Sequence, residues 1–521
     1  MKWRTIEAAR ALLQTEDGAV IQDWGGRVPI ALVFPNSYAV GMSSLAMHGL
    51  YHWLNAMPDV ACERAFASLG RREDRSEPVV TLESQRLLRE TSLIAFSIPY
   101  EMDYGNVVEV LRRSDIPALA RERTVHDPLV LMGGPAVSAN PAVMGPMADA
   151  VMIGEAEESL EGIVEAGRLQ MGRQRDQALD WLSSLPGMWV PRRPQQELVT
   201  RQWVPDLGLR PFASSVVCPQ AEFGDMAMIE LARGCAHACR FCLATRWYRP
   251  FREQSLDQVL ALARRAQGRW PRVGLVSAAV SDYSQIDALV EGLRLEGIQF
   301  SVSSLRAAPL SETLLRGLAS SGVRTLTIAP EAGSQRLRDT MRKGISREDI
   351  MRAVAAANAL GFETLKLYYM VGLPDETEED IAALIDLTDE IARQFDRFVV
   401  VGVSPFVPKA HTPWERCGMA PAEVLDARLA RIRASLQSRS VSVRAESTAL
   451  ARVQGILARG GAEVGEALAT ASRAAPKRVE SLLAKAGLDV EGYLARWAPQ
   501  RPLPWRMVDA RGCPSTGKGA L

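Results

Sequence analysis

Short apolar runs alternate with amphipathic segments through the first third of the chain. The runs at 29–34, 92–98 and 128–134 have the length and the continuous hydrophobicity of buried strands, and the segments after the first two have apolar residues at helical spacing. The stretch 149–167 predicts a strand, a tight turn and a helix. This alternation predicts parallel pairing in a doubly wound, Rossmann-like α/β sheet, whose ligands would bind beyond the carboxyl ends of the strands.

A second alternating series begins at residue 226. Helical stretches separate its strand candidates, for example at 255–267, 311–322 and 346–361. Six consecutive βα units predict a full or partial (β/α)6 TIM barrel, in which the loops after the strands carry the chemistry. The six strand candidates are 227–232, 273–278, 299–304, 324–328, 364–370 and 398–404.

The remaining segments divide the chain into four regions. Residues 171–222 are rich in Arg, Gln, Trp and Pro, and we interpret them as a connecting segment that could form a hairpin. Residues 421–521 have an Ala-, Arg- and Leu-rich helical pattern that ends in a loose tail. The expected order is therefore a Rossmann-like domain at 1–170, the connecting segment, a barrel at 223–420 and a helical C-terminal region.

Composition narrows the class of protein. Sixty-one basic residues balance sixty-one acidic ones, so no overall field attracts the chain to nucleic acid or anionic lipid. The apolar runs are too short to span a bilayer, and the N-terminal residues lack the apolar core of a signal peptide. Seven cysteines without a secretory signal predict reduced thiols in a cytoplasm.

Three of these cysteines, Cys235, Cys239 and Cys242, have the spacing C-x3-C-x2-C directly after the first strand candidate of the barrel. Thiolates bind soft metals, and three from one loop can share one centre. A structural zinc site needs a fourth protein ligand, for which this loop offers His237. A [4Fe–4S] cluster on three cysteines leaves one iron open for a non-protein ligand, which is a catalytic arrangement. The position of the motif favours the cluster.

The segment CAHACRFC, with Phe241 before its third cysteine, resembles the signature of radical S-adenosylmethionine (SAM) enzymes. The resemblance spans about 225–415. It implies that Cys235, Cys239 and Cys242 ligate a [4Fe–4S] cluster, and that SAM chelates the fourth iron through its amino and carboxylate groups. One electron, expected from a flavodoxin- or ferredoxin-type donor, would cleave SAM to methionine and a 5′-deoxyadenosyl radical.

The same resemblance assigns downstream residues to SAM. The segment SVSSLRA places Ser303 and Arg306 toward the ligand, and TIAPEAGSQRLR places Glu331 there. The Gly-Gly-Glu turn that many members use for the amino group is absent from LVSAAVSDY, where backbone groups near Ser277–Ala279 could replace it. The segment SPFVPKAHTPWE closes the series. In LKLYYMVGLPDETEEDI a backbone turn is implied for adenine, and its residues are Val371, Gly372, Leu373 and Pro374.

The N-terminal segments resemble the cobalamin (B12)-binding domain of B12-dependent radical SAM proteins. Matching pieces include LVLMGGPAVSANP and DAVMIGEAEESL. Glycines at the carboxyl edge of a sheet let backbone approach a flat macrocycle closely. The residues implied for the corrin are Gly133, Gly134, Pro135, Gly154, Glu155 and Glu157.

One feature departs from the cobalamin-binding pattern. The Asp-x-His-x-x-Gly loop that supplies an axial histidine in related domains is absent, so cobalamin would bind without a histidine, or the domain has lost the cofactor. The spacing of His48 and His52 suits a metal, but no third ligand accompanies them, and we interpret both as packing residues. The five histidines are His48, His52, His126, His237 and His411.

These resemblances imply a cobalamin-dependent radical methyltransferase that acts at unactivated carbon. Alternatives are a radical rearrangement or cyclisation without methyl transfer, a methylthiotransferase-like modification of RNA or protein, and a non-enzymatic metal-binding protein. Methylthiotransferases hold a second cluster on three N-terminal cysteines, whereas only Cys62 lies in this first domain. No catalytic residue and no substrate, small molecule or peptide, can be assigned.

Four cysteines lie outside the motif. We expect each to be a small, inert residue. Cys218 and Cys417 lie close to the ends of the barrel series and could face its active site. The four are Cys62, Cys218, Cys417 and Cys513.

Overall fold

The computed structural model describes residues 3–70, 77–193, 198–471 and 476–514. The chain forms two compact units. Unit 1 comprises Met1–Asp225, Ile456–Tyr493 and Pro502–Leu521, and unit 2 comprises Met226–Gly455 and Leu494–Arg501. No helix in the described ranges has both the length and the apolar character needed to cross a membrane.

Unit 1 contains a six-stranded sheet with the order β2-β1-β3-β4-β5-β6. The pairs from β2 to β5 are parallel, and β6 is antiparallel to β5. This is a doubly wound sheet of flavodoxin-like order, whose topological switch point lies between β1 and β3. Its strands are β1 (Val28–Ser37), β2 (Val60–Ser68), β3 (Leu93–Ser97), β4 (Leu129–Gly133), β5 (Ala150–Met152) and β6 (Met188–Trp189).

The central strands of this sheet are buried, and their continuous apolar runs therefore predicted them from the sequence. Eight consecutive residues from Val28 are buried in β1, as expected for a strand covered on both faces. A separate pair of parallel strands, β7 (Val199–Trp203) and β17 (Val508–Pro514), also belongs to unit 1. The helices of unit 1 are α1 (Trp3–Thr15), α2 (Tyr38–Gly41), α3 (Leu45–Asn55), α4 (Tyr104–Arg113), α5 (Pro135–Ala139), α6 (Leu160–Met171), α7 (Arg175–Ser184), α17 (Ala462–Thr470) and α18 (Val479–Lys485).

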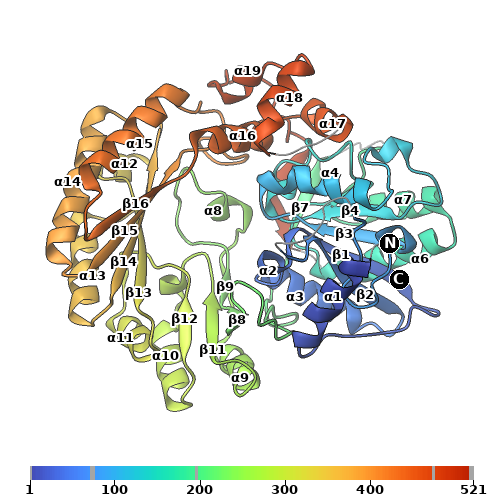
Figure 1. Cartoon of the computed structure of the whole chain (residues 1–521), viewed down its shortest axis with the longest axis horizontal. Coiled ribbons are helices and arrows are strands. Elements are labelled where there is room, and N and C mark those ends of the chain that lie inside the picture. The colour runs from blue at the N-terminus through green and yellow to red at the C-terminus, as the bar shows by residue number, and fades with distance from the viewer. Residues whose placement is uncertain (1–2, 71–76, 194–197, 472–475, 515–521) are drawn as a thin grey trace. The chain divides into compact units, whose positions relative to one another are not determined.

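Unit 2 contains an open parallel barrel. Its two sheets, β8-β11-β12 and β13-β14-β15-β16, are joined by one bridge between Leu305 and Ile328. Figure 1 shows these strands as an arc with helices on its outer side. The barrel strands are β8 (Met226–Glu230), β11 (Arg272–Val276), β12 (Phe300–Val302), β13 (Thr325–Glu331), β14 (Thr364–Val371), β15 (Phe398–Pro405) and β16 (Val441–Ala445).

Several helices of unit 2 begin at a Ser or Thr that caps the helix. Ser255 and Ser311 accept hydrogen bonds from the backbone three residues on, and Ser346 and Thr377 form capping boxes with Asp349 and Asp380. The helices are α8 (Ala244–Trp247), α9 (Leu256–Ala266), α10 (Ile286–Leu295), α11 (Glu312–Ser320), α12 (Gln335–Thr340), α13 (Arg347–Ala359), α14 (Glu378–Gln394) and α15 (Ala422–Leu436); α16 (Thr448–Arg459) and α19 (Val490–Leu494) cross the unit boundary.

Two segments differ from their expected roles. The expected connector 171–222 supplies α7, β6 and β7, and it is part of unit 1 because β6 extends the main sheet. The expected helical region 421–521 is split: α15 and β16 complete the barrel, whereas residues 456–493 belong to unit 1. The α/β class, the doubly wound sheet and the partial barrel are confirmed.

Candidate functional site

The three motif cysteines lie in one loop of unit 2. The loop follows β8 and the short β9 (Ala232–Arg233), which pairs with β10 (Arg252–Glu253). Cys235 and Cys239 are 9% and 5% exposed, and Cys242 is half-buried. Thr245 Oγ1 donates to the carbonyl oxygens of Cys239, at 3.2 Å, and of Cys242, at 2.9 Å, so this hydroxyl fixes the loop from the first turn of α8.

Two of the three thiols in this loop, those of Cys235 and Cys242, are difficult to ionise without a metal. Burial raises the pKa of both Cys235 and Cys242. The neighbouring thiols of Cys239 and Cys235 raise the pKa of Cys242 further, which places the three cysteines within electrostatic reach of one another. Three soft donors in one loop fit a cationic iron–sulfur centre, because a metal stabilises the thiolates of Cys235 and Cys242 that burial disfavours.

Phe241 anchors the cysteine loop to three segments from farther along the chain. Its ring packs against a buried apolar cluster, which therefore brings the motif loop together with the α12 region, the turn after β14 and the loop after β15. The backbone N–H of Arg240 also donates to the carbonyl of Met341, at 2.9 Å. The cluster comprises Ala332, Leu337, Met341, Leu373, Phe406 and Trp414.

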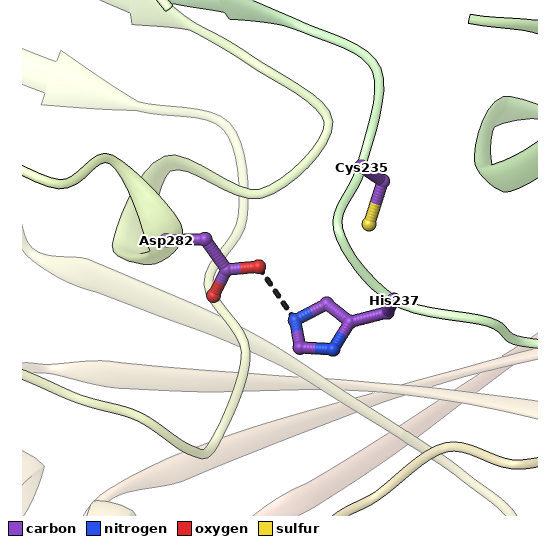
Figure 2. Close-up of side chains that lie close together, drawn as sticks. All are labelled: Cys235, His237 and Asp282. Atoms are coloured by element: carbon purple, nitrogen blue, oxygen red, sulfur yellow. Dashed lines mark ion pairs between the residues drawn. The ribbon is translucent and has the colours of Figure 1, made fainter. Parts of the chain in front are cut away.

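His237, the histidine within the motif, forms a polar contact with Asp282. Its Nε2 lies 2.5 Å from Asp282 Oδ2, and Figure 2 shows the ring directed at that carboxylate beside the Cys235 thiol. Asp282 ends η5 (Val280–Asp282), the short helical turn that follows β11. The segment LVSAAVSDY was considered from the sequence only because it lacks a Gly-Gly-Glu turn, and Asp282 was not singled out. The candidate backbone at Ser277–Ala279 precedes this helical turn.

Arg306 and Ser303, proposed from the third strand, have different environments. Arg306 is buried, and its guanidinium donates to the carbonyls of Lys343, at 2.5 Å, and Ala308, at 3.2 Å. Ser303 is exposed just beyond β12. The guanidinium of Arg306 therefore holds the loop after α12, and its side chain is already occupied by protein carbonyls.

Glu331, proposed from the fourth strand, has left-handed backbone at φ 67°. A residue other than glycine in this region is costly and marks a site where surrounding structure dictates the conformation. Its carboxylate pairs with Lys343 Nζ at 2.8 Å, and both side chains are largely buried. Lys343 was not predicted from the sequence. The chain has only seven lysines, so a lysine close to the fourth strand was a signal that could have been used.

The turn after β14 is rigid and internally bonded. Gly372, at φ 77°, donates its N–H to Glu376 Oε2 at 2.6 Å, and Phe406 donates to the carbonyl of Val371 at 2.8 Å. Arg428 Nη1 also donates to Glu376 Oε2, at 2.7 Å. Two backbone groups expected to meet adenine, the N–H of Gly372 and the carbonyl of Val371, thus form hydrogen bonds within the protein. The remaining surface of this turn, which includes Leu373 and Pro374, is fixed in place.

The concave face of the barrel carries residues that the sequence did not single out. Leu365, Leu367 and Tyr369 of β14 are buried, whereas Lys366 and Tyr368 alternate with them toward the opposite face. The Lys366 ammonium lies 4.9 Å from the centre of the Tyr368 ring. Gly402, the neighbour of Tyr368 across the ladder, leaves space for that ring, since an added Cβ at Gly402 would lie 2.9 Å from it. These side chains form a half-exposed aromatic and cationic surface inside the barrel.

The glycines proposed for a corrin in unit 1 have structural explanations. An added Cβ on Gly134, at φ 106°, would lie 2.6 Å from the carbonyl oxygen of Ile98. At Gly154, at φ 110°, it would overlap the carbonyl oxygen of Gln202. Gly133, by contrast, ends β4 with open space, and its Cβ would meet only Met152 at 3.8 Å.

The other three residues proposed for the corrin are placed as follows. Pro135 is the first residue of α5. The carboxylate of Glu155 accepts a hydrogen bond from the backbone of Val204, at 2.7 Å, and thereby fixes the segment after β7. Glu157 is buried in η4 (Glu157–Ser159). Glu155 is thus already engaged within the protein.

A polar group at the switch point of the sheet was not anticipated. Asp103, buried at the end of η2 (Glu101–Asp103), accepts hydrogen bonds from Asn36 Nδ2, at 2.8 Å, and Asn106 Nδ2, at 3.2 Å. Asn36 lies near the carboxyl end of β1, at the position where ligands of such sheets bind. Burial raises the pKa of Asp103 to about 6, although both amides lower it.

Replacing Asp103 with asparagine should change the pH dependence of stability. A carboxyl with a raised pKa binds its proton more tightly in the folded state, so the free energy of unfolding falls as pH rises from about 4 to about 6. The variant should lack this fall and be more stable at pH 7, by up to about 3 kcal/mol. Thermal unfolding across this pH range measures it, and an unchanged profile would show that burial of Asp103 costs little.

The remaining histidines and cysteines show no second metal centre in the described ranges. His48 Nε2 donates to the carbonyl of Met42, at 3.0 Å, and burial lowers its pKa to about 4, which is the environment of a neutral packing residue. Cys62 and Cys218 are buried in the core of unit 1, and Cys417 packs against the cluster that holds Phe241. The side chain of Cys513 lies outside the described residues.

Two protein-family models match the chain, one in its N-terminal part and one in its central part. Residues 46–191 match the family described as radical SAM proteins, N-terminal, and residues 229–388 match the radical SAM superfamily. The uncharacterized protein MJ0966 of Methanocaldococcus jannaschii is 31% identical over 393 residues, which cover 74% of this chain and 79% of that protein.

More distant relatives cover less of their own length. The uncharacterized methyltransferase PH0819 of Pyrococcus horikoshii is 24% identical over 53% of this chain and 61% of its own. The ribosomal protein uS12 methylthiotransferase RimO of Pelotomaculum thermopropionicum is 26% identical over 47% of this chain and 56% of its own.

A solved structure shares the fold across both units. It is the radical SAM methyltransferase TsrM of Kitasatospora setae with cobalamin and a [4Fe–4S] cluster bound. The two structures superpose with a TM-score of 0.57 and 13% sequence identity, over 88% of this chain and 99% of the TsrM chain. A second structure of TsrM, with tryptophan and a SAM analogue, has a TM-score of 0.52 and 16% identity over 75% of each chain. From the sequence matches and the shared fold, the chain belongs to the family of the Methanocaldococcus jannaschii protein within the radical SAM superfamily, and it is a radical SAM enzyme.

Proposed function

We propose that this protein is a cobalamin-dependent radical SAM methyltransferase that acts at unactivated carbon. The observation that carries the proposal is the presence, in one chain, of a flavodoxin-order sheet and a radical SAM barrel whose three-cysteine loop has two buried cysteines and one half-buried cysteine. The TsrM structure, which has cobalamin and a [4Fe–4S] cluster bound, shares this fold over nearly its full length. The switch point near Asn36 and Gly133, where an added Cβ would meet no atom closer than 3.8 Å, would border the cobalamin.

The chain's own residues would hold and orient these groups. Cys235, Cys239 and Cys242 would ligate the cluster. When bound, the cluster, SAM and cobalamin supply reductive cleavage of SAM to a 5′-deoxyadenosyl radical and a methyl group for transfer. The apolar cluster under Phe241 keeps one side of the cysteine loop free of water, and the hydroxyl of Thr245 fixes its backbone.

Charged residues at the carboxyl ends of the barrel strands would orient SAM. The buried pair of Glu331 and Lys343 offers a carboxylate and an ammonium beside each other, which suits a ligand that carries both an amino and a carboxylate group. Arg306 would act by positioning Lys343 rather than by contact with the ligand, since it holds the carbonyl of that residue. The surface of Lys366 and Tyr368 is available to a substrate that has a planar or acidic group.

A methylthiotransferase is the second candidate, because several curated relatives are named ribosomal protein uS12 methylthiotransferase. Such enzymes hold an additional cluster on three N-terminal cysteines. Of the described cysteines of unit 1, Cys62 and Cys218 are both buried in its hydrophobic core, and no group of three comes together there. We therefore favour methyl transfer without sulfur insertion.

The decisive experiment measures cobalt and methyl transfer in the same preparation. We expect protein produced anaerobically with cobalamin uptake to contain cobalt as well as iron. In the assay, dithionite replaces the biological electron donor. Incubated with SAM that has a deuterated methyl group and a metabolite extract, it should yield one product with the labelled methyl. Cluster-containing protein without cobalt that still forms 5′-deoxyadenosine would favour non-methylating radical chemistry, and a sulfur-containing product would favour the methylthiotransferase.

A further inference from the structure

A second set of metal-binding atoms lies beside the cysteine loop. The Cys235 thiol, a ring nitrogen of His237 and a carboxylate oxygen of Asp282 all lie within 4.8 Å of one another (Figure 2). Cys235 and His237 come from the loop after β9, and Asp282 comes from η5 after β11, so two separate strands of one unit supply the set. In the described ranges, no other group of these residue types has such spacing.

The Asp282 carboxylate is poorly satisfied for a buried charge. Its side chain is only 8% exposed, and its single ion pair in the described structure is to His237, which is charged only when protonated. Its Oδ1 has no hydrogen-bond partner there. A buried carboxylate without a permanent cation is costly, and a divalent ion would satisfy the oxygen that protein groups leave open.

Sulfur, nitrogen and oxygen donors together select the cation. Thiolate and imidazole suit Zn²⁺ and Fe²⁺, and three mixed protein ligands with an open fourth position are typical of reactive rather than structural sites. Alkaline-earth ions prefer oxygen alone, which this set does not offer. Binding would release the thiol proton of Cys235, because thiols bind metals as thiolates.

We propose that, before the cluster is loaded, Cys235, His237 and Asp282 bind one divalent cation, Fe²⁺ or Zn²⁺. The site itself does not depend on the proposed function. Its consequence does, because Cys235 is also a proposed cluster ligand and cannot serve both centres. Iron bound here would be the starting point of cluster assembly, whereas zinc would block it.

Cobalt titration of the cluster-free protein tests this site. Chelator-treated protein, titrated anaerobically with Co²⁺, should bind one ion with thiolate-to-cobalt charge-transfer absorption. Cys235→Ser should abolish that absorption, and His237→Gln and Asp282→Asn should each weaken binding at least about tenfold. Cys242→Ser is the matched control, because it removes a neighbouring thiol outside the set and should leave Co²⁺ affinity unchanged.

The pattern of variants separates this proposal from the proposed function. Since the His237 side chain is 27% exposed, its replacement should leave the fold intact, which circular dichroism of each variant verifies. Co²⁺ binding that survives His237→Gln and Asp282→Asn but is lost in Cys239→Ser and Cys242→Ser would show an ion on the three cysteines and overturn this site. Failure of the reconstituted protein to cleave SAM would contradict the proposed function while the Co²⁺ site remained.

Discussion

Replacing Cys239 with alanine should reduce formation of 5′-deoxyadenosine from SAM to the level of a protein-free blank. Cys239 is 5% exposed, and the Thr245 hydroxyl holds its backbone carbonyl, so the thiol has a fixed place in the loop. Loss of one of three thiolates leaves two, which is too few to retain a cluster whose fourth iron already lacks a protein ligand. Anaerobic reconstitution, analysis of iron and sulfide, and chromatography of the nucleoside product measure the effect.

Cys417→Ala is the control for this variant. Cys417 belongs to the same unit and packs against the same apolar cluster as Phe241, so its replacement tests a nearby cysteine of equal chemistry. We expect this variant to retain the cluster and SAM cleavage. Equal turnover by Cys239→Ala and the parent would remove Cys239 from the ligand set, and equal loss in Cys417→Ala would add Cys417 to it.

The strands that could be predicted from the sequence are those with uninterrupted apolar runs. The runs that became β1, β3 and β4 lie in the interior of the sheet, where both faces are covered. β2 was not predicted, because its sequence contains Glu63 and Arg64. Arg64 is fully buried there, and it pairs with Glu16 at 2.6 Å and Glu83 at 2.7 Å, two carboxylates from distant segments.

A sequence pattern does not reveal such partners, since they come together only in the folded chain. The same limit explains the differences at the C-terminal region. β16 is only five residues long, and it forms because β15 offers it a parallel edge within a segment that is otherwise helical. Local pattern cannot predict which unit a terminal helix joins.

The candidate site shows a similar division. The motif correctly located the cysteine loop after the first barrel strand, and the later segments that the resemblance singled out supply the residues that pack around Phe241. The partners Asp282 and Lys343 were not predicted, because each is a single charged residue in a loop, and its role depends on a contact across the barrel.

Replacing Gly154 with alanine should destabilise unit 1 strongly, by about 3 kcal/mol or more. The backbone at φ 110° is unfavourable for any residue with a Cβ, and that Cβ would overlap the carbonyl oxygen of Gln202. Gly154 also lies inside a short ladder, in which Gln202 donates to Ile153 at 3.0 Å and Glu155 donates to Gln202 at 3.1 Å. To relieve the overlap, the variant must separate these backbones and lose those hydrogen bonds.

Gly26→Ala separates the cost of backbone conformation from the cost of overlap. Gly26 has a positive φ of 75° in the same unit, but no atom lies within 4 Å of an added Cβ, so its replacement should cost only about 1–2 kcal/mol. Thermal unfolding and hydrogen exchange of β5, measured without cobalamin, compare the two variants. If Gly154 is present only to let a corrin approach, Gly154→Ala should lose cobalt and be destabilised no more than Gly26→Ala, which carries the conformational cost alone. A large loss of stability in the cofactor-free protein would instead assign this glycine to packing, and Gly133, whose Cβ has open space, would become the glycine to test against cobalamin.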